Sequence, residues 1–144
     1  MEFFNSTDLA SKASTVLAAN QRRSYSSIYE SADTIMAKEA SESFSNKTFD
    51  IFLSHSFLDA NIIYGLKNTL GENHISVYVY WIEDSSERSK VTAATAERIK
   101  MRMQSCRALL YATSDNAEHS KWMPWELGYF DGIRGKVAIC PITE

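Results

Sequence analysis

The stretch FDIFLSHS, Phe49–Ser56, begins with a short apolar run and ends in polar residues. Apolar runs of this length, rich in β-branched and aromatic residues, are typical of strands that are buried on both faces of a parallel sheet. The polar end marks the point where the chain leaves the sheet. We therefore expect a central strand over residues 49–54, followed by a loop that carries His55 and Ser56.

The rest of the chain alternates between strand patterns and helix patterns. Strands are predicted where apolar residues cluster in short runs, and helices where apolar residues recur at helical spacing. Strictly alternating elements predict an α/β fold, with an open parallel sheet, right-handed crossovers and helices on both faces. The predicted strands are 49–54, 75–81, 107–114 and 136–142, and the predicted helices between them are 58–70, 92–105 and 121–133.

The first 48 residues differ from the remainder, because they are rich in Ser and Ala and contain no Gly or Pro. Their apolar stripes predict two amphipathic helices, with a turn at residues 21–24 and a polar linker over 41–48. The apolar faces must pack on the following domain or on another copy of the chain, and the first is favoured. We expect an N-terminal helical extension and linker over 1–48 and an α/β domain over 49–144. Because the sequence ends soon after the fourth predicted strand, the usual C-terminal helix and strand are expected to be absent.

Composition narrows the class of protein. The chain has 144 residues, of which 44% are hydrophobic and 23% charged, as in ordinary globular domains. The net charge of -3 argues against nucleic acid as the main partner. Cys106 and Cys140 both lie in apolar runs and are expected to be reduced core residues. No apolar span is long enough for a membrane helix, so we expect a cytoplasmic protein without membrane contact.

A second stretch, SKWMPWELGYFDG over Ser120–Gly132, places Glu126 among aromatic residues at a predicted helix start. In open α/β sheets, ligands bind outside the carboxyl ends of the strands, and this helix follows such an end. Glu126 lies one turn after Trp122, so the two side chains share a face. Two interpretations stay open from the residues alone. Glu126 is either a solvated helix-start charge beside core tryptophans, or a carboxylate housed in an aromatic pocket.

Several kinds of site are not supported by the sequence. The chain has no glycine-rich dinucleotide or phosphate loop, no Ser/His/Asp arrangement at recognisable spacing, and no metal-ligating cluster. Two paired carboxylates, as in glycosidases, are also lacking. The basic residues around Arg98 are interpreted as the solvated side of a helix, with phosphate binding as the alternative.

The order of the two stretches resembles the Toll/interleukin-1 receptor (TIR) domain family. FDIFLSHSFLD is similar to the first strand and loop of a TIR domain, and SKWMPWELG is similar to the family signature S-x-W-x-x-x-E-[LI]. The resemblance covers roughly Phe49–Ile142 and implies a flavodoxin-like TIR fold. The segment WMPWELGYFDG is most similar to bacterial TIR-like proteins, including those of Thoeris-type antiphage defence.

Carried over position by position, the resemblance implies the following site. Glu126 is the catalytic carboxylate, and Trp122 is part of the pocket wall. The first loop is implied to line the pocket with Ser54, His55, Ser56 and Phe57. The second loop is implied to place Trp81 and Asp84 at the mouth of the pocket. The second strand and its loop, which carry Trp81 and Asp84, match the family only loosely. NAD⁺ is then the substrate, and no further cofactor or metal is expected.

The function implied is an NAD⁺ glycohydrolase or cyclase. It cleaves the nicotinamide–ribose bond, gives nicotinamide and ADP-ribose or cyclic ADP-ribose, and serves bacterial immunity against phage. Self-association through the TIR domain and the N-terminal helices is expected. Two alternatives stay open: a non-enzymatic TIR–TIR assembly module, and an enzyme similar to nucleoside deoxyribosyltransferases, which also place a glutamate by a ribose.

Overall fold

The computed structural model describes residues 4–23, 31–42, 47–81 and 90–144. Within these residues the strands form one five-stranded parallel sheet in the order β1-β5-β4-β2-β3. The strands are β1 (Phe4–Asn5), β2 (Phe49–Ser54), β3 (Val77–Tyr78), β4 (Cys106–Thr113) and β5 (Val137–Thr143). The α-helices are α1 (Ser6–Arg23), α2 (Ala32–Glu42), α3 (Ala60–Glu72), α5 (Ala93–Gln104) and α6 (Met123–Arg134), with short 3₁₀ helices η1 (Phe57–Asp59) and η2 (Ala117–His119).

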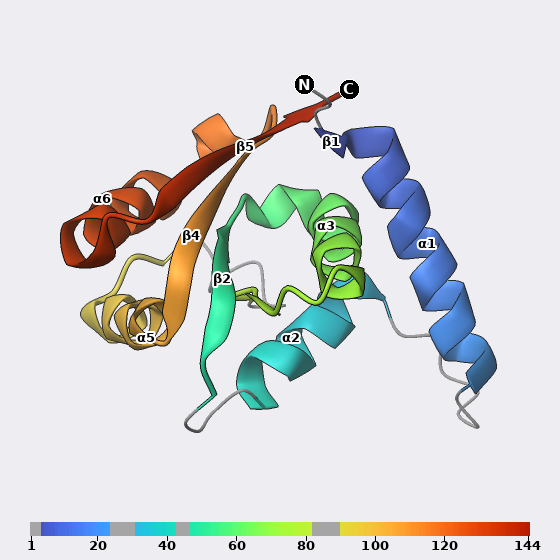
Figure 1. Ribbon diagram of the computed structural model, residues 1–144, viewed down its shortest axis with the longest axis horizontal. Coiled ribbons are helices and arrows are strands. Elements are labelled where there is room, and N and C mark those ends of the chain that lie inside the picture. Colours follow the sequence, from blue (N-terminus) through green and yellow to red (C-terminus); the bar gives the residue numbers. More distant parts are fainter. Residues whose placement is uncertain (1–3, 24–30, 43–46, 82–89) are drawn as a thin grey trace.

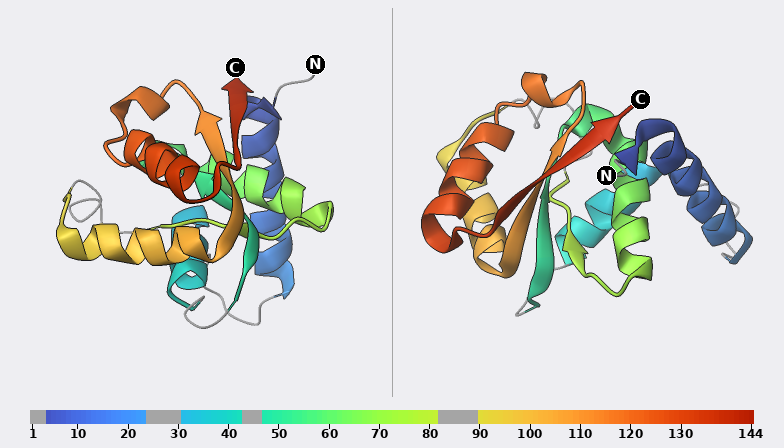
Figure 2. Two further views of the ribbon diagram at one scale, coloured as in Figure 1. Left: turned by 60° about the vertical axis from the view of Figure 1, so that its left-hand side comes forward. Right: turned by 45° about the horizontal axis from the view of Figure 1, so that its top comes forward.

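Helices cover both faces of the sheet, as the sequence predicts. Helices α1, α2 and α3 lie on one side of the strands, and α5 and α6 lie on the other (Figures 1 and 2). Adjacent side chains of β2 point to opposite faces of the sheet, because side chains alternate along a strand. Leu53 belongs to the core beneath α1–α3, and Phe52 belongs to the core beneath α5 and α6. The predicted burial of the first strand on both faces is confirmed.

Some predicted boundaries are corrected. The strand predicted over 75–81 pairs with β2 only at Val77–Tyr78, so Tyr80 and Trp81 extend beyond the ladder. The turn predicted at 21–24 is wrong at its start, because α1 continues to Arg23. The linker predicted over 41–48 is wrong at its start, because α2 continues to Glu42. Residues 24–30, with the first part of the second apolar stripe, and residues 43–46, half of the predicted linker, lie outside the described residues.

The N-terminus contributes a strand that the sequence analysis missed. β1 pairs in parallel with β5, with Phe4 opposite Ile142 and Asn5 opposite Thr143. The Asn5 side chain then accepts a hydrogen bond from the Asp8 amide at 3.1 Å, as N-terminal capping residues do. The start of the chain therefore joins the edge of the sheet and leads directly into α1.

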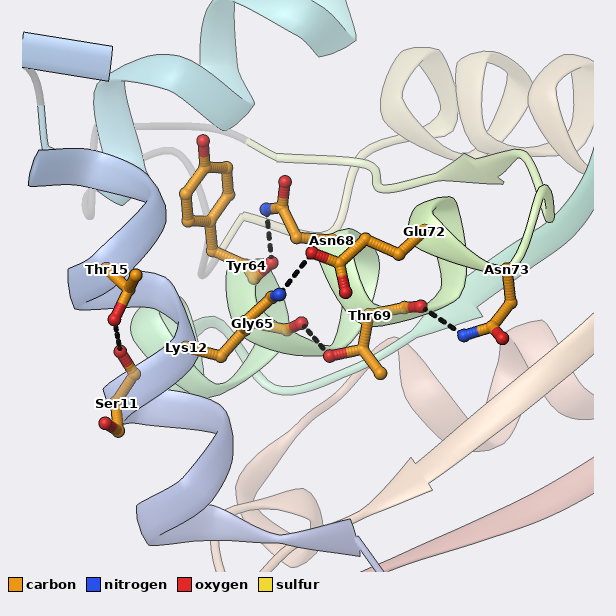
Figure 3. A network of polar contacts seen from close by, with 9 residues as sticks. All are labelled: Ser11, Lys12, Thr15, Tyr64, Gly65, Asn68, Thr69, Glu72 and Asn73. Carbon is orange, nitrogen blue, oxygen red and sulfur yellow. Dashed lines mark hydrogen bonds and ion pairs between the residues drawn. The ribbon is translucent and has the colours of Figure 1, made fainter. Parts of the chain in front are cut away.

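Helix α1 packs on α3 (Figure 3). Leu9, Ala13 and Leu17 are buried in the core that α1 and α3 share, and Lys12 forms an ion pair with Glu72 of α3. Helix α2 also packs on α3, where its Glu39 pairs with Lys67. The apolar faces of both N-terminal helices are thus covered within the same chain. The division at residue 48 stays a prediction.

The two cysteines lie in separate cores. Cys106 packs beneath α5 and α6, Cys140 packs on the opposite face, and both are free and buried. Across the described ranges, no helix combines the length and the apolar character needed to cross a membrane.

Candidate functional site

Glu126 is positioned by the first turns of α6. The helix follows Trp122 as its N-cap, and Pro124 falls in the first turn, where no backbone donor is required. The amide of Glu126 donates to the Trp122 carbonyl at 2.8 Å, and its side chain is directed to the carboxyl end of β2. There the Ser54 hydroxyl donates to Glu126 Oε1 at 2.9 Å. Glu126 is only 5% exposed, so the interpretation as a solvated surface charge is wrong.

Burial changes the acidity of this carboxyl. Removal from water disfavours the charged form and raises the pKa of Glu126 from its usual 4.5 to about 7, while the Ser54 hydroxyl acts in the opposite direction. Glu126 therefore titrates near neutral pH. A group with this property in a pocket is a candidate for a catalytic role.

A small cavity adjoins the carboxylate. Its volume is ≈ 10 Å³, which is at the lower limit for one water molecule. Aromatic and aliphatic side chains from the β2 loop, the segment after β3, α5 and the start of α6 line it. The lining residues are His55, Phe57, Tyr80, Ile99, Trp122 and Glu126.

The loop after β2 supplies one wall of the cavity. His55 and Phe57 line it, and Ser54, which is fully buried, reaches Glu126 directly. The His55 ring is fixed between two backbone carbonyls, with Nδ1 3.2 Å from the Ser56 oxygen and Nε2 3.2 Å from the Tyr80 oxygen. The structure thus brings Ser54, His55 and Phe57 together with Glu126, and their role in binding the substrate stays a prediction.

Other predicted positions lie elsewhere. Ser56 does not line the cavity; its hydroxyl caps η1 by accepting from the Leu58 amide at 3.3 Å. Trp81 is not at a pocket mouth, because it is 3% exposed and packs in the core beneath α1–α3, behind the cavity wall. Asp84 lies outside the described residues.

Trp122 combines both roles that the sequence left open. It is buried in the core beneath α5 and α6 and also lines the cavity beside Glu126. Trp125 packs against the edge of Trp122, with ring centroids 5.5 Å apart, and stacks on Tyr129 at 5.7 Å. Trp125 therefore supports the position of Trp122 in the cavity wall.

Sequence reasoning missed three residues around Glu126. Tyr80 and Ile99 line the cavity, and Tyr111 of β4 lies near enough for Glu126 to affect its acidity. Burial, and then the Glu126 charge, raise the pKa of Tyr111. Burial is also the main cause that raises the pKa of Tyr80. Both phenols stay protonated at neutral pH. Tyr80 lies near the carboxyl end of the strand predicted over 75–81, and this position was the signal that could have found it.

Two curated proteins are similar to this chain. A probable 3′ cyclic ADP-D-ribose synthase, ThsB′, of Bacillus cereus (strain MSX-D12) is 60% identical over 100 residues, which are 69% of this chain and 52% of that protein. A putative cyclic ADP-D-ribose synthase, TIR2, of Cytobacillus dafuensis is 28% identical over 110 residues, which are 75% of this chain and 29% of that protein. The fold and both TIR motifs agree with these matches. The chain is a bacterial TIR-like protein.

The match is partial in length. The TIR-like protein spans about half of the Bacillus cereus relative and less of the Cytobacillus one. No family model matches the chain. In the part of the TIR-like protein that the structure describes, no group of His, Cys, Asp and Glu side chains is arranged to hold a metal ion.

Proposed function

We propose that this TIR-like protein cleaves the bond between nicotinamide and ribose in NAD⁺ and converts the rest into a cyclic ADP-ribose. The observation that carries the proposal is the buried Glu126, hydrogen-bonded to Ser54 at the ligand-binding edge of the sheet. The names of the two relatives, both cyclic ADP-D-ribose synthases, support the same reaction.

A single carboxylate suits this reaction. Nicotinamide in NAD⁺ is a pyridinium that already carries a positive charge, so it leaves as a neutral molecule and needs no general acid. Glycosidases need a second carboxyl group to protonate their leaving group. What the transition state requires is an anion near the ribose, because positive charge develops there. A fixed carboxylate in a site that excludes water provides this stabilisation.

The acidity of Glu126 is compatible with that role. With a pKa of about 7, the carboxyl is available in both forms near neutral pH. A bound pyridinium places a positive charge beside it, which favours the ionised form. The substrate thus promotes the charge state that the reaction uses, and Ser54 orients the oxygen that carries it.

The mostly aromatic lining of the cavity favours a cyclic product over hydrolysis. The cavity of ≈ 10 Å³ holds one water at most, so the nicotinamide end of NAD⁺ enters only when the wall moves. Once the substrate fills this space, water has little access to the ribosyl cation. A group of the same molecule then captures the cation and closes the ring.

We also propose the biological setting. The resemblance to Thoeris-type TIR proteins supports a role in antiphage defence, in which the cyclic nucleotide is the signal. Self-association belongs to the same proposal. Cells that express the chain with its natural neighbouring genes should resist phage, and the Glu126→Gln variant should abolish that resistance.

The direct test is incubation of purified protein with NAD⁺. Nicotinamide release is followed by chromatography, and mass spectrometry separates a cyclic product from ADP-ribose, which is heavier by one water. Glu126→Gln should lower the rate by ~10²–10³, as the loss of one key electrostatic group does in comparable sites. Glu118→Gln is the matched control, because Glu118 is an exposed carboxylate of η2 in the preceding loop. Equal rates for the parent and Glu126→Gln would refute the proposal.

An assembly module without catalysis is the second candidate. Exposed apolar side chains support it: Leu58 is 67% exposed, Met101 65% and Ile139 56%. Light scattering that shows concentration-dependent oligomers, with no NAD⁺ turnover at any concentration, would favour this function. Turnover of deoxynucleosides but not of NAD⁺ would instead favour the deoxyribosyltransferase alternative.

A further inference from the structure

Trp81 connects the N-terminal helix α2 to the wall of the Glu126 cavity. On one side its indole Nε1–H donates to Oδ1 of Asp33 in the first turn of α2, at 3.1 Å. Because Trp81 is only 3% exposed, this hydrogen bond keeps a buried donor satisfied.

On the other side, Trp81 contacts two residues that line the cavity. The indole stacks on the His55 ring, with centroids 5.0 Å apart and planes 19° apart. It meets Phe57 edge-on at 5.4 Å and 71°, and Phe57 meets His55 at 5.5 Å and 88°. The three rings are in mutual contact, so a rotation of the indole displaces the two that face Glu126.

Helix α2 is itself held in place. Ala32 and Met36 are buried in the same core as Trp81, so apolar packing fixes the position of the helix. The chain of contacts therefore runs from a packed helix, through one hydrogen bond and one indole, to His55 and Phe57. Small movements matter at its end, because the cavity has a volume of only ≈ 10 Å³. A misplacement of about 1 Å in an active site costs up to about 10²-fold in rate.

We propose that α2 positions the aromatic wall of the site, with Asp33 as the positioning residue and Trp81 as the side chain that transmits its effect. This inference rests on the proposed NAD⁺ cleavage for its kinetic consequence. Its structural part concerns only Asp33, Trp81 and the two wall residues. The N-terminal segment then has a role in substrate handling as well as in packing.

Kinetics on the full chain test the proposal. Asp33→Ala removes the acceptor and should lower kcat/KM for NAD⁺ by about 10- to 10²-fold. Asp33→Asn keeps an acceptor oxygen and should restore most of the activity. Glu39→Ala is the matched control, because it removes a different polar contact of α2, the ion pair with Lys67 of α3, yet leaves Trp81 bonded to Asp33. Its kcat/KM should equal that of the parent, even if its melting temperature falls as far as that of Asp33→Ala.

A double-mutant cycle separates positioning from general destabilisation. Trp81→Phe removes the indole donor, so adding Asp33→Ala to it should cause little further loss in kcat/KM. Additive losses would overturn the proposal. So would an Asp33→Ala variant whose kinetics match those of Glu39→Ala, or an Asp33→Asn variant as impaired as Asp33→Ala.

A readout without turnover distinguishes this inference from the proposed function. In NMR spectra of the full chain, Asp33→Ala should shift the Trp81 indole N–H and the ring signals of His55, whereas Glu39→Ala should leave both in place. If the parent cleaves no NAD⁺, the proposed function fails while these spectra still test the coupling. Unchanged His55 signals in Asp33→Ala would refute the coupling itself.

Discussion

At the scale of the residue, the chemistry depends on one carboxyl that burial makes a weak acid and one hydroxyl that partly offsets that effect. Glu126 has a pKa of about 7, and the Ser54 hydrogen bond lowers it. If the anion is the reactive form, kcat/KM should fall as the pH drops below about 7. Ser54→Ala removes the group that lowers the pKa, so the acid limb of the profile should move to higher pH. Initial rates of nicotinamide release across the pH range measure this.

The control for Ser54→Ala is Ser105→Ala. This substitution also removes a hydroxyl that donates a hydrogen bond, to the Arg102 carbonyl at 2.7 Å, but Ser105 lies at the end of α5 and does not bond Glu126. Its acid limb should coincide with that of the parent. An acid limb for Ser54→Ala that stays in place, or moves to lower pH, would contradict the assignment of Glu126 as the titrating group.

The same carboxyl predicts a pH-dependent cost in stability. The folded state holds Glu126 with a pKa of about 7, against its usual 4.5, so the folded protein binds the proton more tightly than the unfolded chain does. The stability from this group is full below pH 4.5 and is lost as the pH rises through about 7. The difference between the two pKa values corresponds to at most about 3 kcal/mol. Glu126→Gln, which keeps an acceptor for Ser54, should therefore be more stable than the parent at about pH 8 and not at about pH 4.5.

Urea unfolding of both proteins at the two pH values measures this difference. The midpoint of Glu126→Gln should exceed that of the parent only at the higher pH. A variant that is less stable than the parent at about pH 8 would show that the folded state favours the ionised carboxylate.

At the scale of the element, two loops meet at Asp59. Its carboxylate, 3% exposed, accepts hydrogen bonds from the Ser114 hydroxyl and from the Asn116 amide at 2.7 Å. Asp59 lies in the loop that follows β2 and carries His55. Ser114 and Asn116 lie in the loop that follows β4 and leads to the helix of Glu126. Asp59→Ala should cost about 1–3 kcal/mol of stability and lower kcat/KM, because it frees the two loops that form the site from each other.

Asp50 provides the comparison for Asp59. Its carboxylate also links two elements, since Oδ2 accepts from the Ser76 amide at 2.9 Å and from the Ser76 hydroxyl at 3.0 Å, but at the opposite end of β2. Asp50→Ala should lose stability without losing kcat/KM in the protein that stays folded. Equal kinetic effects of the two substitutions would show that Asp59 acts only through global stability.

Apolar runs and helical spacing predict those elements that are long enough to show such a pattern. The central strand and the helix of Glu126 carry clear patterns, and the structure contains both. β1 is only two residues long, Phe4–Asn5, so its sequence contains no period to detect. The strand predicted over 75–81 is too long, because the apolar run continues past the β2–β3 ladder to Trp81, whose ring stacks on His55.

The site shows the same division. Two sequence motifs contain Glu126, Trp122 and the β2 loop, so these residues can be recognised from the sequence alone. Trp81 belongs to a three-dimensional arrangement, because its partner Asp33 lies 48 residues away in the chain. Tyr111 reaches the site only through the pairing of β4 with β2. No local pattern records either contact.

At the scale of the whole molecule, the N-terminal segment completes the α/β layers. β1 adds an edge strand beside β5, and α1 joins α3 on one face of the sheet (Figures 1 and 3). The approach of the two helices depends on Gly65 in the middle of α3. A Cβ atom added there would lie 2.0 Å from the Leu9 carbonyl oxygen, far inside contact distance, and the obstacle is backbone that cannot rotate away. Docking of α1 thus requires glycine at this position.

A pair of glycines in α3 tests this dependence. Gly65→Ala should force α1 away from α3 and lower the melting temperature, although alanine is the better helix former by about 1 kcal/mol. Gly71→Ala, in the same helix, meets nothing within 4 Å and should leave the melting temperature unchanged or raise it. Thermal unfolding of both variants, with hydrogen exchange of the α1 amides, measures the effect. If Gly65→Ala is as stable as Gly71→Ala and its α1 amides stay protected, the N-terminal helix does not depend on this close approach. If only Gly65→Ala loses that protection, the close packing of α1 on α3 at Gly65 holds the N-terminal helix in place.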